Sequence, residues 1–161
     1  MKKLLLSLIC TIALIAPTMS FAATFKKAQE IYYRIVIANN IGNAPELVFD
    51  PNESVNAMTI IDEGEGVIIV YKGLLDEVKN DDELALVLGH ELGHWLHRGT
   101  QKPYYAEYDR DRYGAYVMDK AGYNHCTGAN VLWRFGNTSS DTHPAGRDRF
   151  LAITRTCYAP R

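Results

Sequence analysis

The sequence has few cysteines and no excess of charge of one sign. Three cysteines occur among its 161 residues, and the formal net charge is −2 at pH 7. Proteins that bind nucleic acid usually carry a basic patch, so this mild acidity argues against nucleic acid as a partner. Long apolar runs are also scarce. Beyond the one from Leu4 to Ala16 there is no other, so we expect no stable membrane span in the remainder of the chain.

The apolar run has the layout of a secretory signal. Lys2 and Lys3 precede it, and Ser20-Phe21-Ala22 follows it with small residues at the two positions that signal peptidases require. The run is also short for a transmembrane helix. We therefore expect residues 1–22 to be a signal peptide that is cleaved near Ala22, and residues 23–161 to form one domain that is periplasmic or secreted. A retained membrane anchor is the alternative.

Export would change the meaning of the cysteine count. Cys10 would leave with the signal peptide, and Cys126 and Cys157 would remain as a pair in an oxidising compartment. We expect a disulfide bond between them, with two free buried thiols as the alternative. Neither state makes them zinc ligands, because nothing pairs the two cysteines at metal-site spacing.

The pattern H-E-x-x-H occurs once, from His90 to His94. Residues four apart on a helix lie on one face, so the two imidazoles can bind one zinc ion from the same side. Glu91 would then lie near the metal, where it can take a proton from zinc-bound water. The alternative is that two histidines stand four residues apart by chance.

The residues around this pattern favour a helix. Asn80 and Glu83 have the spacing of a capping box, and the acidic first turn suits the positive end of the helix dipole. Arg98-Gly99 indicates where the helix stops. His97 lies two turns from His90, about 10.5 Å along the axis, which is too far to share one ion.

A third metal ligand is expected from the next helix. Glu107 and Asp111 are four residues apart and share a helix face, whereas Asp109 points away. Glu107 is therefore the best candidate, and it would complete a His₂Glu site with one position open for water. Asp111 can accept the other ring N–H of a zinc-binding histidine. The alternative is a charged, solvated helix face.

Hydrophobic periodicity and turn residues predict an α+β fold. A small, mostly antiparallel sheet would pack on the zincin-type active-site helix, and a helical C-terminal half would follow. Strands are expected at 46–50, 55–61 and 67–71, with the last of these in the centre of the sheet. Helices are expected over 25–40, 74–79, 104–120, 127–135 and 145–156.

Several segments together resemble the zinc peptidases of the gluzincin group that include the CAAX prenyl proteases and the membrane protease HtpX. The segments that carry this resemblance are Val55-Asn56-Ala57, Val67 to Leu75, Asp82 to His94, Glu107-x-x-x-Asp111, His143-Pro144 and Arg149.

The resemblance implies roles for these residues. Glu107 would bind zinc and Asp111 would support a zinc histidine. The strand at Asn56-Ala57 would be an edge that pairs with an extended substrate peptide. His143 and Arg149 would lie near the metal and steady either the oxyanion or Glu107, although His143 could simply precede a helix that starts with proline.

The sequence also departs from these relatives. It lacks their transmembrane helices, so prenylated substrates are not implied. The connection from His94 to Glu107 is short, which leaves either an open cleft or a cleft that a regulatory or inhibitory partner protein completes.

The sequence therefore predicts a zinc-dependent endopeptidase that cleaves exported or envelope proteins. It would hold one Zn²⁺ per chain and use zinc-activated water, with Glu91 as the general base. The alternative is a peptide-binding chaperone or assembly factor that uses the same fold with weak proteolysis or none.

Overall fold

The computed structural model describes residues 21–97, 103–140 and 143–157 and confirms the predicted α+β class. The predicted signal peptide falls almost entirely outside these residues. Within them, no helix is long and apolar enough to cross a membrane. The elements in chain order are α1 (Phe21–Ala38), β1 (Glu46–Asp50), β2 (Ala57–Asp62), β3 (Glu65–Tyr71), α2 (Lys72–Glu77), α3 (Asp81–Leu96), α4 (Pro103–Lys120), α5 (His125–Gly128), α6 (Asn130–Arg134) and α7 (Gly146–Thr154).

The sheet is mixed rather than mostly antiparallel. Its strand order is β1-β3-β2, with β3 antiparallel to β2 and parallel to β1. Successive strands alternate in direction, and β3 inserts between the other two instead of extending the sheet beyond β2, so one pair is parallel. The predicted central position of β3 is confirmed, and its Ile68 and Val70 are fully buried. The order leaves β2 at an edge.

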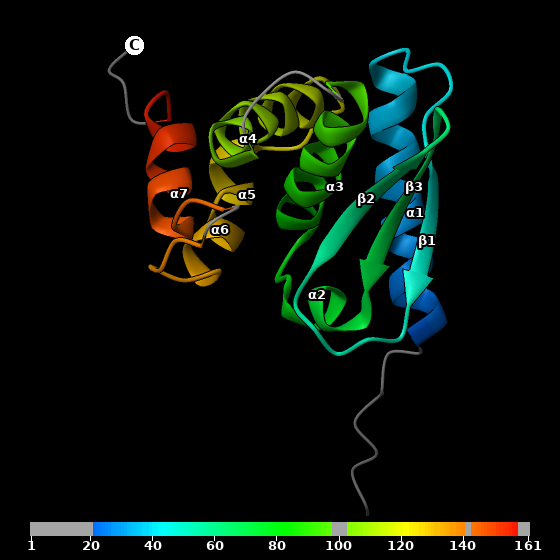
Figure 1. Cartoon of the computed structure of the whole chain (residues 1–161), viewed down its shortest axis with the longest axis horizontal. Helices are drawn as coiled ribbons and strands as arrows, with labels where there is room; N and C mark the ends of the chain where they lie inside the picture. The colour runs from blue at the N-terminus through cyan, green and yellow to red at the C-terminus, as the bar shows by residue number, and fades with distance from the viewer. Residues whose placement is uncertain (1–20, 98–102, 141–142, 158–161) are drawn as a thin grey trace, which may run out of the picture.

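Helix α3 lies between the sheet and the helical half of the molecule. The sheet and α1 lie on one side of it, and α4 to α7 lie on the other (Figure 1). The predicted N-cap is present, since Asn80 Oδ1 accepts a hydrogen bond from the backbone N–H of Glu83 at 3.0 Å. The second half of the capping box is shifted by one residue, because the Glu83 carboxylate accepts from the N–H of Lys79 rather than Asn80. The predicted stop at Arg98-Gly99 lies outside the described residues.

Two glycines let α3 and α4 cross at short range. A Cβ atom added at Gly89 would lie 2.9 Å from the Cα of Gly114, and one added at Gly114 would lie 2.9 Å from the backbone N of His90. Any side chain at either position would push the helices apart. The glycine pair therefore brings the H-E-x-x-H turn of α3 against the acidic face of α4.

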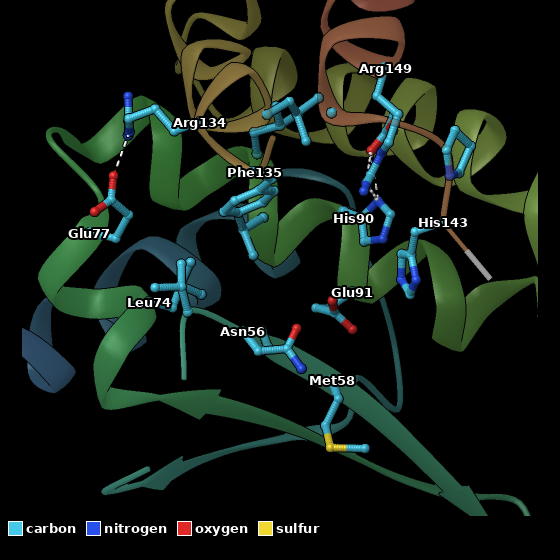
Figure 2. A pocket seen from close by; sticks show the side chains of 18 of the residues that line it. Asn56, Met58, Leu74, Glu77, His90, Glu91, Arg134, Phe135, His143 and Arg149 are labelled. Atoms are coloured by element: carbon cyan, nitrogen blue, oxygen red, sulfur yellow. Dashed lines mark hydrogen bonds and ion pairs between the residues drawn. The ribbon is translucent and has the colours of Figure 1, made fainter. Parts of the chain in front are cut away.

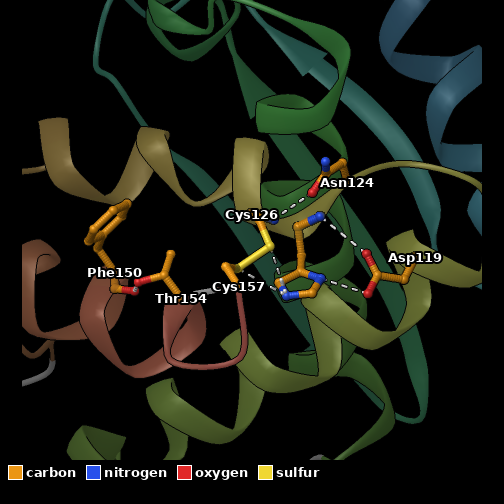
Figure 3. Close-up of a disulfide and its surroundings, with 7 residues drawn as sticks. Asp119, Asn124, Cys126, Phe150, Thr154 and Cys157 are labelled. Atoms are coloured by element: carbon orange, nitrogen blue, oxygen red, sulfur yellow. Dashed lines mark hydrogen bonds and ion pairs between the residues drawn. A yellow bond between two sulfur atoms is a disulfide. The ribbon is translucent and has the colours of Figure 1, made fainter. Parts of the chain in front are cut away.

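The C-terminal segment returns to the helical half. The segment predicted as one helix over 127–135 is two short helices, α5 and α6, that meet at Ala129. The sulfur atoms of Cys126 and Cys157 lie 2.09 Å apart, at the distance of the predicted disulfide, and this link ties α5 to the residues after α7 (Figure 3). The α7 helix is thereby held against the rest of the domain.

Candidate metal centre

Three potential metal ligands, the side chains of His90, His94 and Glu107, converge where α3 meets α4. His90 Nε2 lies 3.0 Å from His94 Nε2 and 3.5 Å from Glu107 Oε2, and His94 Nε2 lies 3.4 Å from Glu107 Oε1. Ligands bound tetrahedrally to zinc at 2.0–2.2 Å stand about 3.3–3.5 Å from one another. The triangle formed by these three side chains therefore has the size that one zinc ion requires.

The burial of Glu107 supplies an independent test of this fit. Its side chain is 4% exposed, and its Oε2 atom has no hydrogen-bond partner among the described residues. Burial alone would raise the pKa of Glu107, but the hydrogen bond to His94 and the charges of His90 and Arg149 lower it. An ionised, buried oxygen without a hydrogen bond is costly unless a cation lies beside it. The residues present thus fit a bound metal ion.

Asp111 lies behind the triangle and is 1% exposed. Its Oδ1 is 2.8 Å from His90 Nδ1, and its two oxygens accept hydrogen bonds from Arg149 at 2.6 and 2.7 Å. Burial by itself would raise the pKa of Asp111, but the hydrogen bonds and charges of Arg149 and His90 bring it down to about 2. A carboxylate that stays ionised accepts the Nδ1–H of His90 and leaves the Nε2 lone pair for a metal.

The structure places Arg149 and His143, the two residues expected near the metal, in different environments. The Arg149 side chain is 8% exposed and reaches Asp111, with Nη2 3.7 Å from Glu107 Oε2. The His143 side chain is 57% exposed, and its Nε2 lies 3.5 Å from the same oxygen of Glu107. Arg149 is therefore positioned to support the carboxylates, whereas His143 faces solvent at the rim (Figure 2).

Glu91 lies beside the triangle and contacts the edge strand. Its carboxylate Oε2 is 2.7 Å from the hydroxyl of Thr59 on β2. Asn56 precedes β2 and Ala57 begins it, so both expected substrate-strand residues lie at an outer edge of the sheet formed by the described residues. Sequence reasoning missed Thr59. Strand alternation could have found it, because Thr59 shares a face with Ala57.

A cavity of about 860 Å³ opens between β2, α3 and the α6–α7 region. Phe135 and Leu74 project into it, and an ion pair between Arg134 Nε and Glu77 Oε1 at 2.7 Å closes its far side (Figure 2). These residues come from α2, α6 and the residue after α6, and the sequence contained no periodic signal that joined them. The other apolar residues that line the cavity include Val55, Met58, Leu86, Val87 and Leu132.

His125, Cys126 and Cys157 form a second group of potential metal ligands where α5 meets the residues after α7. His125 Nε2 is 3.5 Å from the sulfur atoms of Cys126 and Cys157, and its Nδ1 is 2.6 Å from Asp119 Oδ2. Because the two sulfurs stand at bonding distance, they offer no thiolate to a metal.

No curated protein and no solved structure matches the chain significantly. The family model described as Peptidase family M48 matches residues 22–105. The matched segment contains the edge strand and the complete H-E-x-x-H turn, and it ends two residues before Glu107. Since the match covers more than half of the sequence, the chain belongs to peptidase family M48, a family of metallopeptidases.

Proposed function

We propose that this M48 member is a zinc-dependent endopeptidase of the gluzincin group, similar to the CAAX prenyl proteases and HtpX, and that it cleaves exported or envelope proteins. The observation that carries the proposal is the triangle of His90, His94 and Glu107, which lies next to Glu91. Within the described part of the chain, the buried Oε2 of Glu107 has no hydrogen-bond partner. Without a metal, the nearest charged or ionisable groups that the structure describes around that oxygen are Arg149 Nη2 at 3.7 Å and the imidazoles of His90 and His143 at 3.5 Å, and a bound cation would compensate its charge more closely.

These three side chains would hold the ion, which when bound acts as a Lewis acid toward the scissile carbonyl and lowers the pKa of water. Glu91 takes a proton from the attacking water and delivers it to the leaving amine. Asp111 keeps His90 in the tautomer that ligation needs, and Arg149 balances the charge of Asp111 and Glu107. His143, exposed at the rim, is positioned to donate a hydrogen bond to the developing oxyanion.

The edge strand and the cavity support an extended peptide as the substrate. Strand β2 has no partner on its outer side within the described sheet, so a peptide can pair with it near Asn56 and Ala57. Leu74, Leu132 and Phe135 line the adjoining cavity, so an apolar side chain of the peptide would bury favourable surface there. We infer a preference for sites that carry a bulky apolar residue beside the scissile bond.

Replacement of Glu91 by glutamine tests the catalytic assignment. Glutamine keeps the size of the side chain but cannot accept a proton, so hydrolysis of casein should fall by about 10²–10⁴-fold. Zinc content by mass spectrometry and the melting temperature should stay at wild-type values. Full activity in the Glu91→Gln variant would refute Glu91 as the base, and a zinc-loaded wild type without any turnover would favour a peptide-binding protein.

Export is part of the proposal and has its own test. The mature protein should start at Ala23 and lie in the periplasm or the medium, because Ser20 and Ala22 suit signal peptidase. Intact-mass measurement of the exported material gives the first residue directly. A membrane-bound species that keeps residues 1–22 would contradict the assignment.

A further inference from the structure

One hydrogen bond joins the edge strand β2 to the proposed general base. The Thr59 hydroxyl on β2 lies 2.7 Å from Glu91 Oε2 and 3.0 Å from the backbone carbonyl oxygen of Glu91. Both groups are at least partly buried, and Thr59 lines the same cavity as Glu91. The contact therefore lies within the site and not on an outer surface.

The shorter of the two contacts identifies the acceptor. A hydroxyl carries one proton, and a carboxylate is a stronger acceptor than a helix carbonyl. A distance of 2.7 Å is typical of a charge-assisted bond from a hydroxyl to an ionised carboxylate. Thr59 thus donates to Oε2, and Oε1 is the oxygen that stays available to a water molecule.

A glutamate side chain needs such a tether to act efficiently. It has three side-chain torsions, and ordering them costs conformational entropy. A fixed hydrogen-bond partner orders these torsions before the substrate binds, so the cost does not add to the barrier of the reaction. A general base must lie within hydrogen-bond reach of the proton that it removes. Among the described residues, Thr59 is the one side chain that donates a hydrogen bond to the Glu91 carboxylate.

We propose that Thr59 is a positioning residue that orients Glu91 for proton transfer. The inference rests on the proposed peptidase function and deepens it. Because Thr59 belongs to the strand whose open edge would pair with the substrate, the same residue fixes the base relative to the bound peptide. The strand would then contribute to the chemical step as well as to binding.

A structural role is the competing explanation, since the same hydroxyl also lies near the α3 backbone. Thr59→Val removes the hydroxyl at nearly constant volume, and Thr59→Ser retains it. Tyr71→Phe is a matched control. It also removes one hydroxyl from the sheet, but that hydroxyl contacts Met58 Sδ at 3.1 Å and does not touch Glu91.

The experiment compares steady-state kinetics on a fluorogenic peptide taken from a casein cleavage site. Loss of a hydrogen bond to a charged group should lower kcat of Thr59→Val by about 10–100-fold, with KM changed less than about threefold. Thr59→Ser should recover most of the loss, and Tyr71→Phe should match wild type. Zinc content and melting temperature should remain near wild type in all three variants.

A double variant decides whether Thr59 acts through Glu91. Adding Thr59→Val to Glu91→Gln should cause little further loss of residual activity, because the tethered group is already disabled. An equal loss in both backgrounds, a wild-type kcat for Thr59→Val, or a failure of serine to rescue would each overturn the proposal. Should Thr59→Val not fold, Thr59→Ala replaces it beside Thr59→Ser. Full activity of Glu91→Gln would instead refute the function on which the inference rests.

Discussion

Among the residues that the structure describes, there are two clusters in which an aspartate contacts Nδ1 of a histidine that stands beside two other potential metal ligands. In one, Asp111 contacts His90 at 2.8 Å, and in the other Asp119 contacts His125 at 2.6 Å. The first cluster is largely buried and keeps its ligand atoms 3.0–3.5 Å apart. The second is half-exposed, and two of its three ligand atoms lie at bonding distance from each other.

The comparison shows that an aspartate–histidine pair does not by itself define a metal site. The two clusters differ in two properties. One is the spacing of the remaining donor atoms, and the other is whether a buried carboxylate needs a counter-ion. Among the residues that the structure describes, Glu107 Oε2 has ion-pair contacts at 3.5–3.7 Å but no hydrogen-bond partner, whereas the atoms around His125 lie in close contact with one another. We therefore expect zinc at His90 and a purely structural link at His125.

The largest expected difference is in zinc content. Glu107→Ala removes one of three ligands, so the variant should lose its zinc and its peptidase activity, and its melting temperature should fall because the metal stabilises only the folded state. His125→Ala should keep one zinc per chain. Metal analysis by mass spectrometry after gel filtration measures both variants. If Glu107→Ala retains the metal, the third ligand is another residue, with Asp111 and His143 the next to test.

The cysteine cluster should instead govern stability. The disulfide joins Cys126 to Cys157, which are 31 positions apart in the sequence. On the chain-entropy account such a link is worth about 3–4 kcal/mol, so Cys126→Ser with Cys157→Ser should lower the free energy of unfolding by that amount. Zinc content should not change. Urea unfolding of wild type with and without a reductant provides the control, and quantitative alkylation of both thiols in non-reduced protein would contradict the link.

The parts of this design that follow local rules could be read from the sequence. The helix that carries His90 and His94 begins where the cap residues indicate, and Glu107 faces it because four-residue spacing fixes a helix face. The central position of β3 followed from its β-branched run. Each of these depends on residues close in the chain.

The parts that depend on distant pairing could not be read in this way. The parallel pairing of β3 with β1 was not predicted, because the residues within a strand do not show the direction of its neighbour. The contact of Thr59 with Glu91 joins residues 32 positions apart, and the Arg134–Glu77 pair joins residues 57 apart. The crossing at Gly89 and Gly114 likewise depends on two helices whose separation is set only in the folded domain.

The smallest expected effect is a change in zinc affinity when the aspartate beside each histidine, Asp111 or Asp119, loses its charge. Asp111→Asn keeps the shape of the side chain but removes the charge that two groups, His90 and Arg149, both use. Loss of such an outer carboxylate should weaken zinc binding by about 10–100-fold, which corresponds to about 1.4–2.7 kcal/mol. Asp119→Asn is the matched control, since it also removes the charge beside a histidine, and its zinc affinity should equal that of wild type. Competition with a chromophoric chelator at fixed pH gives both affinities.

Because asparagine can still accept a hydrogen bond through its amide oxygen, Asp111→Ala should weaken zinc binding further than Asp111→Asn. Equal zinc affinities for Asp111→Asn and Asp119→Asn would mean that the buried carboxylate does not tune the metal, and that the two clusters differ in donor spacing alone.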